Sequence, residues 1–600
     1  MSVAILGISA FYHDSAAALI INGEIIAAAQ EECFTRKKHD AGFPEHAIKY
    51  VLEEAGISID DITAIAFYDK PMLKFERLLE TYHAFAPKGL ASFVTAIPVW
   101  IKEKLFIKKL LKDKIALLSK KNTTILFPEH HLSHAASAFY PSPFNEAAIL
   151  TIDGVGEWAT TTICYGISNE IKILRELHFP HSLGLLYAAF TDYLGFEIND
   201  GEYKLMGLAS YGNPEAPGVI ELKKKILDQL LDLREDGSFI LNMEYFEFAT
   251  RLRMTNPKRW QLLFGFPKRE PESAINQDHI NLALAIQELT ELIVIALAKT
   301  AQKLTNCSNL VLAGGVALNC VANSKLAAAG IFKQIWIQPA AGDAGGALGA
   351  AYAAYHIYYK NKRSICGDKD FMKGAYLGPE YSDKDFLRVI NKYNMPYRHF
   401  ANFNDLTAIV SEKIADGKVI AWFQGRMEFG PRSLGNRSIL GDPRNPEMQS
   451  IINIKVKARE EFRPFAPSVL LEDVSNYFKT NIPSPYMLFV YPVNEDLRKQ
   501  EPVNYMDMDH TSRLNHIRSV IPSVTHVDYS ARIQTVSKEG NPRFWQLITD
   551  FKKLTGCAIL INTSFNIRGE PIVCTPEDAY KDFVNTEIDC LVLGNFLLEK

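Results

Sequence analysis

The stretch AILGISAFYHDSAAALIINGEI, residues 4–25, decides the fold class of this chain. It contains a buried-type strand, a short polar loop, a second apolar strand and an Asn-Gly-Glu turn. Residues 148–171, AILTIDGVGEWATTTICYGISNEI, can be laid over it with a two-residue insertion and end at Ser-Asn-Glu. The match indicates an internal duplication. Chance recurrence of a short strand-turn-strand pattern is the alternative interpretation.

Helical segments follow each hairpin, at residues 44–57 and 181–195, so the sequence predicts two related α/β lobes whose loops hold a ligand. After a long Ala/Gly-rich helix, the polar stretch around residues 361–373 is typical of a linker. We therefore predict a first domain at 1–360, a linker at 361–373 and an independent α/β domain at 374–600. The second domain has its own expected strands at 418–425, 557–565 and 589–600, and helices at 405–417 and 541–556.

The bulk composition is that of a large globular chain: 600 residues, 48% hydrophobic and 22% charged. The 65 basic and 69 acidic residues give a net charge of −4, which provides no global attraction for nucleic acid or an anionic membrane. Eight scattered cysteines without a CxxC pair favour a reducing compartment. The apolar stretch at 89–101 contains a proline and is shorter than the about 20 residues that span a bilayer. We expect a cytoplasmic protein with no membrane span and no nucleic-acid partner.

A lysine-rich segment at residues 101–122 places eight lysines among aliphatic residues at helical spacing. Most such segments are solvated faces of amphipathic helices. An acidic partner or a membrane surface is the alternative interpretation.

His130 and His134 stand four residues apart at the start of an alanine-rich helix. If that helix begins by Glu129, both imidazoles project from one face and can share a cation, whereas His131 faces elsewhere. Asp153 and Asp343, each in a glycine-flanked loop after a strand, are the best candidates for further ligands. Iron, manganese or zinc would suit such a set. Histidines that merely begin a helix are the structural alternative.

Two glycine-containing loops follow apolar strands, and their backbone amides could approach phosphate oxygens. One carries Gly154 and Gly156, and the other carries Gly314 and Gly315 and leads into a helix. Neither is a Walker or Rossmann motif, and a tight strand-to-helix turn explains each equally well. His13, in the first hairpin loop, could act as a general base or cap a turn.

The second domain carries cationic side chains among glycines and prolines, in Gly425–Arg444 and Lys455–Pro467. Clustered arginines suit a small phosphate or carboxylate, and surface salt bridges are the alternative. Three neutral polar residues after a strand could complete the pocket: Asn562, Ser564 and Asn566. The cations are Arg426, Arg432, Arg437, Arg444, Lys457, Arg459 and Arg463.

Taken together, the motifs FYHDSAAAL, HHLSHAASAFYPSPF, DGVGEW, LAGGVALN, GDAGGALGAA, GRMEFGPRSLGNRSIL, REEFRPFAPSVL and LINTSFNIRGEPIV resemble those of the NodU/CmcH family of O-carbamoyltransferases. This family includes nodulation-factor, cephamycin and TobZ-like aminoglycoside enzymes. The resemblance covers nearly the whole chain. It implies a duplicated actin-like ATPase domain (ASKHA, Kae-like) followed by a YrdC-like α/β domain.

The resemblance also implies a reaction sequence. Carbamoyl phosphate is cleaved in the YrdC-like domain, the carbamate is adenylated with ATP, and carbamoyladenylate donates its carbamoyl group to an acceptor hydroxyl. It further implies that His13 deprotonates the acceptor and that His130, His134, Asp153 and Asp343 hold a divalent metal, with Fe²⁺ favoured over Mn²⁺ or Zn²⁺, while Mg²⁺ accompanies ATP.

The remaining predicted site residues divide into two groups. We expect carbamoyl phosphate to bind at Arg432, Arg437, Lys457, Arg459, Arg463, Asn562, Ser564 and Asn566. We expect the nucleotide to bind at Gly154, Gly156, Glu202, Lys204, Gly314, Gly315 and Asn319. Residues 199–212, NDGEYKLMGLASYG, depart from the family pattern, since Glu202 and Tyr203 precede Lys204 and Ser210 replaces a proline.

Two other functions fit parts of the sequence. A tRNA threonylcarbamoylation-type enzyme shares both domain types, but the near-neutral charge argues against a tRNA substrate. A nucleotide-dependent switch would need neither a base at His13 nor the arginine-rich pocket. The expected acceptor is a hydroxyl of a small molecule or sugar-containing natural product, which no motif identifies. A homodimer is compatible with the sequence, which does not determine oligomeric state.

Overall fold

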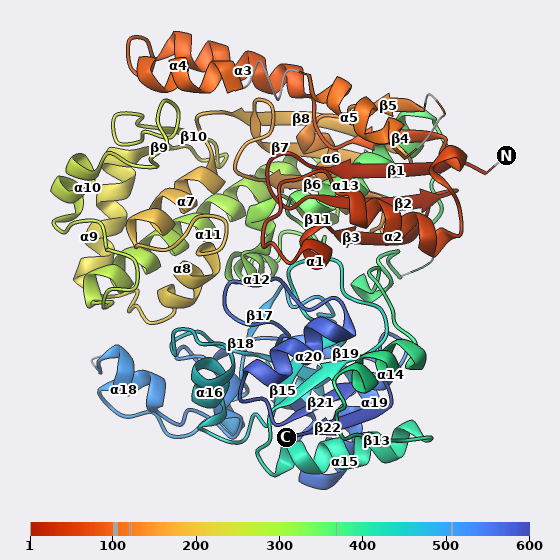
Figure 1. Ribbon diagram of the computed structural model, residues 1–600. Coiled ribbons are helices and arrows are strands. Elements are labelled where there is room, and N and C mark those ends of the chain that lie inside the picture. Colours follow the sequence, from red (N-terminus) through yellow and green to blue (C-terminus); the bar gives the residue numbers. More distant parts are fainter. Residues whose placement is uncertain are drawn as a thin grey trace. The chain divides into compact units, whose positions relative to one another are not determined.

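The computed structural model describes residues 2–99, 106–118, 121, 123–365, 367, 369–505 and 508–600. The chain divides into two compact units (Figure 1). Unit 1 comprises Met1–Glu31 and Ala41–Phe371, and unit 2 comprises Glu32–Asp40 and Met372–Lys600. A nine-residue piece of the N-terminal region therefore belongs to the C-terminal unit.

Unit 1 contains two five-stranded sheets with the same topology. In each, a central strand pairs antiparallel with the next strand of a three-stranded meander and parallel with one later strand, which in turn pairs parallel with another. The first sheet has the order β3 (Glu24–Gln30), β2 (Ala16–Ile21), β1 (Ala4–Ser9), β4 (Ala64–Phe67), β5 (Thr124–Leu126). The second has the order β8 (Glu170–His178), β7 (Ala159–Ile167), β6 (Glu146–Ile152), β11 (Asn309–Ala313), β12 (Gln334–Ile337). The predicted duplication and the actin-like arrangement of the first domain are confirmed.

Two helices pack between these sheets and against each other: α6 (His130–Phe139) and α13 (Asp343–Tyr352). Both consist mainly of small residues, which lets the backbones approach closely. A Cβ on Gly7 of β1 would lie 1.9 Å from the Ala347 carbonyl oxygen, and one on Gly349 would lie 1.7 Å from that of Ser133. Glycine is therefore required at both contacts. This packing fixes α13 against β1 and against α6.

The other helices of unit 1 surround the two sheets (Figure 1). The predicted helices at 44–57 and 181–195 are confirmed as α2 and α7. The set is α2 (Glu45–Ala55), α3 (Pro71–Ala84), α4 (Leu90–Val99), α5 (Ile107–Ala116), α7 (Leu183–Tyr193), α8 (Glu202–Ala209), α9 (Pro217–Lys225), α10 (Pro257–Phe264), α11 (Gln277–Thr305) and α12 (Cys320–Ala328).

Helix α11 is long and apolar enough to cross a membrane, by length and composition alone, and no other helix in the described part of the chain meets that test. However, 61% of its apolar window is buried inside the protein. The helix packs against α8, α9, α12 and β6. These contacts are those of a core helix of unit 1.

Unit 2 is built on one mixed eight-stranded sheet. Its order is β13 (Arg398–His399), β22 (Phe596–Glu599), β21 (Cys590–Leu593), β14 (Ile420–Phe423), β15 (Arg437–Gly441), β20 (Ile559–Ser564), β16 (Ala466–Leu470), β19 (Gln534–Val536). The strands expected at 418–425, 557–565 and 589–600 and the helices expected at 405–417 and 541–556 are all present. The main helices are α14 (Asp383–Lys392), α15 (Phe403–Ala415), α18 (His510–Asn515), α19 (Pro542–Thr555) and α20 (Pro576–Asn585). The α/β class is confirmed, and the YrdC-like assignment stays a prediction.

Two short segments are each held by one arginine. Arg36, just after α1 (Glu32–Thr35), donates to the carbonyl oxygens of Ile572 at 2.6 Å and Pro571 at 2.9 Å, which ties residues 32–40 into unit 2. Arg363, in the stretch predicted as a linker, donates to four carbonyls just beyond and at the end of α6. Arg363 therefore ties the start of that stretch to unit 1, whereas Met372 and Lys373 at its end belong to unit 2. The acceptors are Phe139 at 2.6 Å, Tyr140 at 3.1 Å, Ser142 at 2.8 Å and Phe144 at 2.6 Å.

Candidate metal centre and anion site

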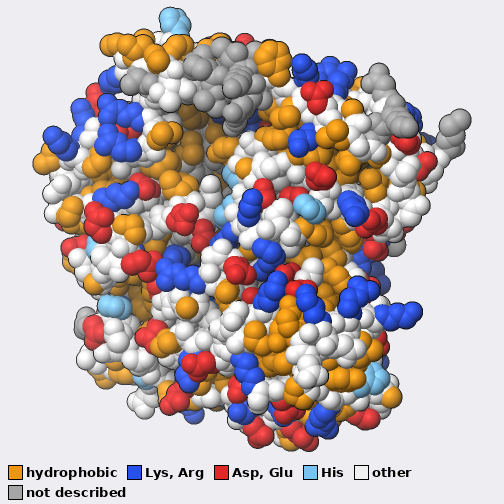
Figure 2. Space-filling view, in the orientation of Figure 1, with side chains coloured by type: hydrophobic (Ala, Val, Ile, Leu, Met, Phe, Trp, Pro, Cys, Tyr) orange, Lys and Arg blue, Asp and Glu red, His pale blue; other side chains and the backbone are white. Residues whose placement is uncertain are grey.

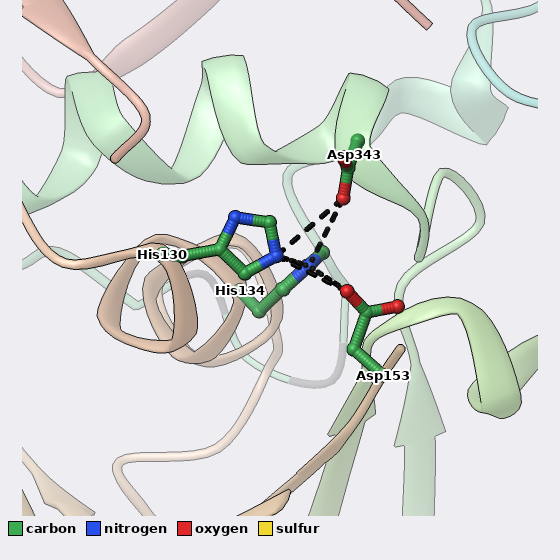
Figure 3. A group of neighbouring side chains, drawn as sticks. All are labelled: His130, His134, Asp153 and Asp343. Atoms are coloured by element: carbon green, nitrogen blue, oxygen red, sulfur yellow. Dashed lines mark hydrogen bonds and ion pairs between the residues drawn. The ribbon is translucent and has the colours of Figure 1, made fainter. Parts of the chain in front are cut away.

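Four side chains from three separate segments of unit 1 converge on one point (Figure 3). His130 and His134 come from the first two turns of α6, Asp153 follows β6, and Asp343 begins α13. The predicted i, i+4 geometry is present, since α6 begins at His130 with Glu129 as its extended N-cap. Both helices point their N-termini at the group, where the helix dipole and free amides favour negative charge.

The spacing of the donor atoms fits a metal. His130 Nε2 lies 3.1 Å from His134 Nε2 and 3.1 Å from Asp153 Oδ2. Asp343 Oδ1 lies 3.5 Å from both imidazole nitrogens. Ligands at about 2.1 Å from a tetrahedral ion lie roughly 3.4 Å from one another. Two imidazole nitrogens and two carboxylates therefore form a donor set and a size that suit a first-row divalent cation.

Two effects set the pKa values in this group: burial, and the interactions between the histidines and the two aspartates. Burial alone would lower the pKa of His134, but hydrogen bonds to Asp153 and Asp343 raise this pKa to about 9. Burial would raise the pKa of Asp153, but the two histidines hold it well below its ordinary value. Both carboxylates are thus held in the charged form that binds metals.

His13 adjoins this group from the β1–β2 loop. Its Nε2 lies 3.6 Å from Asp343 Oδ2, and its Nδ1 lies 3.0 Å from Asp14 Oδ2. Burial would lower the pKa of His13, but Asp343 and Asp14 raise this pKa to about 9. Positive φ angles at Phe11 (70°) and Asp14 (51°) show that the loop is sharply bent around the histidine.

Glu157 has a positioning role that the sequence did not reveal. Its buried carboxylate accepts from the backbone N–H of His130 at 3.0 and 3.1 Å and from that of Lys70 at 2.7 Å. One charge thus satisfies the first amides of α6 and α3 together. A sequence signal existed, since Glu157 lies in the loop equivalent to His13, but its partners are distant in the chain.

The predicted nucleotide residues fall into different environments. Gly315 donates its N–H to Asp153 Oδ1 at 2.9 Å, so this glycine loop also orients a predicted metal ligand. Gly314 has φ 87°, and a Cβ there would meet the Ile152 carbonyl oxygen at 2.3 Å. Gly154 and Gly156 lie in the loop after β6, and a Cβ on Gly156 would meet the His130 side chain at 3.0 Å.

The other three predicted nucleotide residues lie in or near helices packed around α11. Glu202 begins α8 and accepts from the Asn199 N–H at 3.2 Å. Lys204 lies 5.8 Å from the centre of the Phe196 ring. Asn319 caps α12 and exchanges two amide hydrogen bonds with Gln287, at 2.9 and 3.1 Å. These bonds hold the Asn319 side chain at the cap of α12, and its predicted nucleotide contact stays a prediction.

In unit 2, a buried lysine forms the centre of a cationic group. Lys457 Nζ contacts the Ser564 backbone carbonyl, and it donates to the Asn566 carbonyl oxygen at 2.9 Å and to Asn566 Oδ1 at 2.8 Å. Burial, with Arg459 and Arg463 nearby, holds the pKa of Lys457 well below its ordinary value. Burial and Arg463 likewise lower the pKa of Arg459. Several cations thus share one desolvated region, which favours an anion.

Other predicted anion ligands have structural roles instead. Arg437 is fully buried in β15, lies 3.6 Å from the Phe423 ring centre and donates to the carbonyls of Gln424, Asn436 and Pro379 at 2.6 to 3.0 Å. Asn562 lies on β20. Its side-chain amide donates to Gln534 Oε1 at 2.9 Å, to Ser468 Oγ at 3.1 Å and to the Ser433 carbonyl at 3.3 Å.

Arg432, another predicted carbamoyl phosphate ligand, lies in a folded loop between β14 and β15. It is half-buried there. Glu428 Oε1 holds the loop by accepting from the backbone amides of Leu434 at 2.7 Å and Asn436 at 2.9 Å. The cationic group supported by direct contacts or shared electrostatics is therefore Lys457, Arg459 and Arg463, with Ser564 and Asn566.

Comparison with known proteins decides the family. The model for the carbamoyltransferase N-terminus matches residues 4–352, and that for the carbamoyltransferase C-terminus matches residues 411–600. This chain belongs to the carbamoyltransferase family. It is accordingly a transferase enzyme, which confirms the predicted family and argues against the nucleotide-switch interpretation.

Relatives of this carbamoyltransferase cover most of its length. An uncharacterized protein of Synechocystis is 55% identical, over 99% of this chain and 96% of the relative. Nodulation protein NolNO of Sinorhizobium fredii is 38% identical, over 98% of this chain and 79% of the relative. The 3'-hydroxymethylcephem-O-carbamoyltransferase of Streptomyces clavuligerus is 31% identical, over 78% of this chain and 79% of the relative.

Proposed function

We propose that this carbamoyltransferase uses ATP and carbamoyl phosphate to carbamoylate a hydroxyl group of a small molecule or sugar-containing natural product. The convergence of four metal-type ligands beside His13 carries the proposal. The O-carbamoyltransferase named among its relatives supports transfer to oxygen. The acceptor class follows from the family resemblance and stays a proposal.

The proposed reaction has three balanced steps. Water cleaves carbamoyl phosphate to carbamate and phosphate. The carbamate oxygen then attacks the α-phosphorus of ATP, which gives carbamoyladenylate and releases pyrophosphate. Finally the acceptor oxygen attacks the carbamoyl carbon, AMP leaves, and the hydroxyl proton goes to a base. Free carbamate is labile in water, so keeping it enclosed within one protein limits its loss.

His13 is the proposed base for the final step. Asp14 holds the Nδ1 atom of His13 at 3.0 Å. The Nε2 atom therefore faces Asp343 and the proposed metal centre. General-base catalysis needs this imidazole in its neutral form, so His13 would act as the base when a cation on Asp343 removes the charge that raises the His13 pKa. Asp14 therefore serves as the positioning partner.

The four converging ligands are the proposed holders of a divalent metal: His130, His134, Asp153 and Asp343. A divalent cation there would neutralise both carboxylates and stabilise negative charge on a nucleotide phosphate. Iron is the proposed metal, with manganese or zinc as the alternatives that the donor set also accepts. Mg²⁺ is the proposed counter-ion of ATP.

The nucleotide phosphates are proposed to bind where the glycine loops and the two helix N-termini meet. The loops at Gly154–Gly156 and Gly314–Gly315 flank Asp153, and α6 and α13 begin at His130 and Asp343. The helix dipole at such an end favours phosphate. Glu202 and Lys204 are proposed to contact other parts of the nucleotide.

Unit 2 is the proposed site of carbamoyl phosphate. Lys457, Arg459 and Arg463 supply positive charge in a buried setting, and Ser564 with Asn566 supplies neutral hydrogen-bonding groups. Such charge-assisted bonds stabilise a leaving phosphate dianion. No nucleic-acid partner is proposed, because basic and acidic side chains are interspersed over the face shown in Figure 2.

The test is mass spectrometry of products after the protein is incubated with ATP, carbamoyl phosphate and a divalent metal, without acceptor. We expect carbamoyladenylate and pyrophosphate that depend on both substrates and are absent in His130→Ala. A folded, metal-loaded protein that forms neither product would refute the adenylate route. Pyrophosphate formed without carbamoyl phosphate would point to a different carbamoyl source.

A further inference from the structure

The edge of unit 1 that carries α3, α4 and α5 exposes several large apolar side chains (Figure 1). On α4, Leu90 is 67% exposed and Val94 is 63% exposed. These two residues stand four apart, so they share one face of the helix. The segment at 89–101 contains no charged residue, and among the described side chains of α4 the exposed ones are Leu90, Val94 and Thr95.

The opposite side of α4 is held to unit 1. Ser92 Oγ donates to the Thr250 backbone carbonyl, and Tyr82 Oη donates to Ser92 Oγ at 3.2 Å. The Phe93 ring meets the Tyr82 ring edge-on at 5.2 Å between centres. The helix is thus anchored by one face while Leu90 and Val94 face outward. Exposed apolar residues on an anchored helix are typical of a contact surface.

Helix α5 carries positive charge, and Figure 1 draws it apart from α4, nearer to β4 and β5. Ile107, Leu111 and Ile115 face inward and are buried. Its exposed charged residues are Lys108, Lys109, Lys112 and Asp113, so the lysines outnumber the acid. Phe106, 52% exposed, and Leu117, 80% exposed, flank the helix at its two ends. In Figure 2 the edge over α3 and α4 likewise carries apolar side chains near Lys and Arg side chains.

We propose that the exposed residues of α4 and α5 form a docking surface for an anionic lipid bilayer, a function independent of the carbamoyl-transfer reaction. Aliphatic side chains enter the headgroup boundary, and lysine ammonium groups contact lipid phosphates. A protein partner fits less well, because protein interfaces are enriched in arginine and depleted in lysine. Helix α3 is left out of this surface, since Glu76 and Glu80 are exposed beside Met72 and Leu79.

Flotation of the full chain with lipid vesicles tests the proposal. We expect binding to phosphatidylcholine vesicles that contain phosphatidylglycerol, loss of binding as salt is raised, and little binding to pure phosphatidylcholine. The triple variant Lys108→Glu, Lys109→Glu, Lys112→Glu should lower the partition coefficient by about 100-fold or more, since each lysine near such a surface contributes about fivefold. Leu90→Ser with Val94→Ser should also lower it.

A charge-matched control separates docking from net charge. Lys299, Lys303 and Lys333 are exposed on other segments of unit 1, so their reversal to glutamate changes the total charge equally. This control should retain vesicle binding. Equal losses in both triple variants, or no binding to anionic vesicles, would overturn the proposal. So would a dimer in sedimentation that Val94→Ser dissociates, because the apolar face would then be an interface between copies.

Discussion

The metal-type centre of unit 1 and the cationic group of unit 2 are both buried and charged, yet their side chains relate to one another in opposite ways. Around His130 and His134, donor lone pairs converge at 3.1 to 3.6 Å with two carboxylates. Around Lys457, positive charges are gathered and lower one another's pKa. The first arrangement is stabilised by an added cation and the second by an added anion.

The difference also concerns how each group is supported. The centre in unit 1 is held by helix starts and backbone amides, including those of Gly315 and His130. Lys457 is held by the turn that contains Ser564 and Asn566. We therefore expect the geometry of the metal centre to depend on the residues that hold its ligands in place. We expect anion binding in unit 2 to depend on the positive charges of the site.

Removal of a proposed metal ligand should have the largest effect. In Asp153→Asn we expect loss of bound metal and a fall in carbamoyl transfer of about 100- to 1000-fold, the range for loss of a preorganised electrostatic group. Metal content by mass spectrometry and a product assay measure the two effects. Asp192→Asn, which breaks only the ion pair with Lys268, is the control and should retain metal. Full metal occupancy in Asp153→Asn would contradict the assignment.

The matching change in unit 2 is Lys457→Met. It removes a positive charge from the anion site, so we expect KM for carbamoyl phosphate to rise by about 100-fold, while ATP affinity measured by calorimetry stays the same. Lys455→Met is the control, because Lys455 is exposed and pairs only with Glu587 at 3.2 Å in the described contacts. A similar rise in the control, or weaker ATP binding in Lys457→Met, would argue against separate sites.

Glu157→Gln tests the outer support of the metal centre. The amide can still accept from the His130 N–H but loses the charge at the two helix starts, so we expect metal affinity to fall by about tenfold. Titration calorimetry on the metal-free protein measures it without reference to activity. Glu129→Gln is the control, since Glu129 lies next to His130 but pairs with Lys70 at a half-exposed position. An equal loss in both variants would show a general charge effect.

The sequence predicted those features that depend on local periodicity. Strand alternation and the repeated turn identified the duplication, and helical spacing placed His130 and His134 on one face. Asp153 and Asp343 could be proposed because carboxylates at strand ends in glycine loops often face a ligand. The structure brings all four together, as the spacing led us to expect.

Features that depend on distant partners have no local signal in the sequence. Asn319 follows a glycine loop as a nucleotide ligand would, but Gln287, on α11, occupies its amide. Arg437 belongs to an arginine-rich loop, yet backbone carbonyls surround its guanidinium. Residues 32–40 join unit 2 through Arg36 and the chain near Ile572. No local pattern encodes contacts over hundreds of residues, so residue type alone could not separate ligand from support.

The smallest change that should reveal the dependence of the metal centre on its outer contacts is Gly315→Ala. An added Cβ would lie 3.0 Å from Asp153 Oδ1, so the carboxylate must move by a few tenths of an ångström. We expect metal affinity to fall by about threefold, less than the roughly tenfold loss typical of an altered outer contact. Gly342→Ala, beside the ligand Asp343, is the control, because its Cβ would meet no atom within 4 Å. If both variants bind metal as the parent does, the glycine loop can shift without affecting metal binding. The N-termini of α6 and α13 alone would then set the spacing of the ligands.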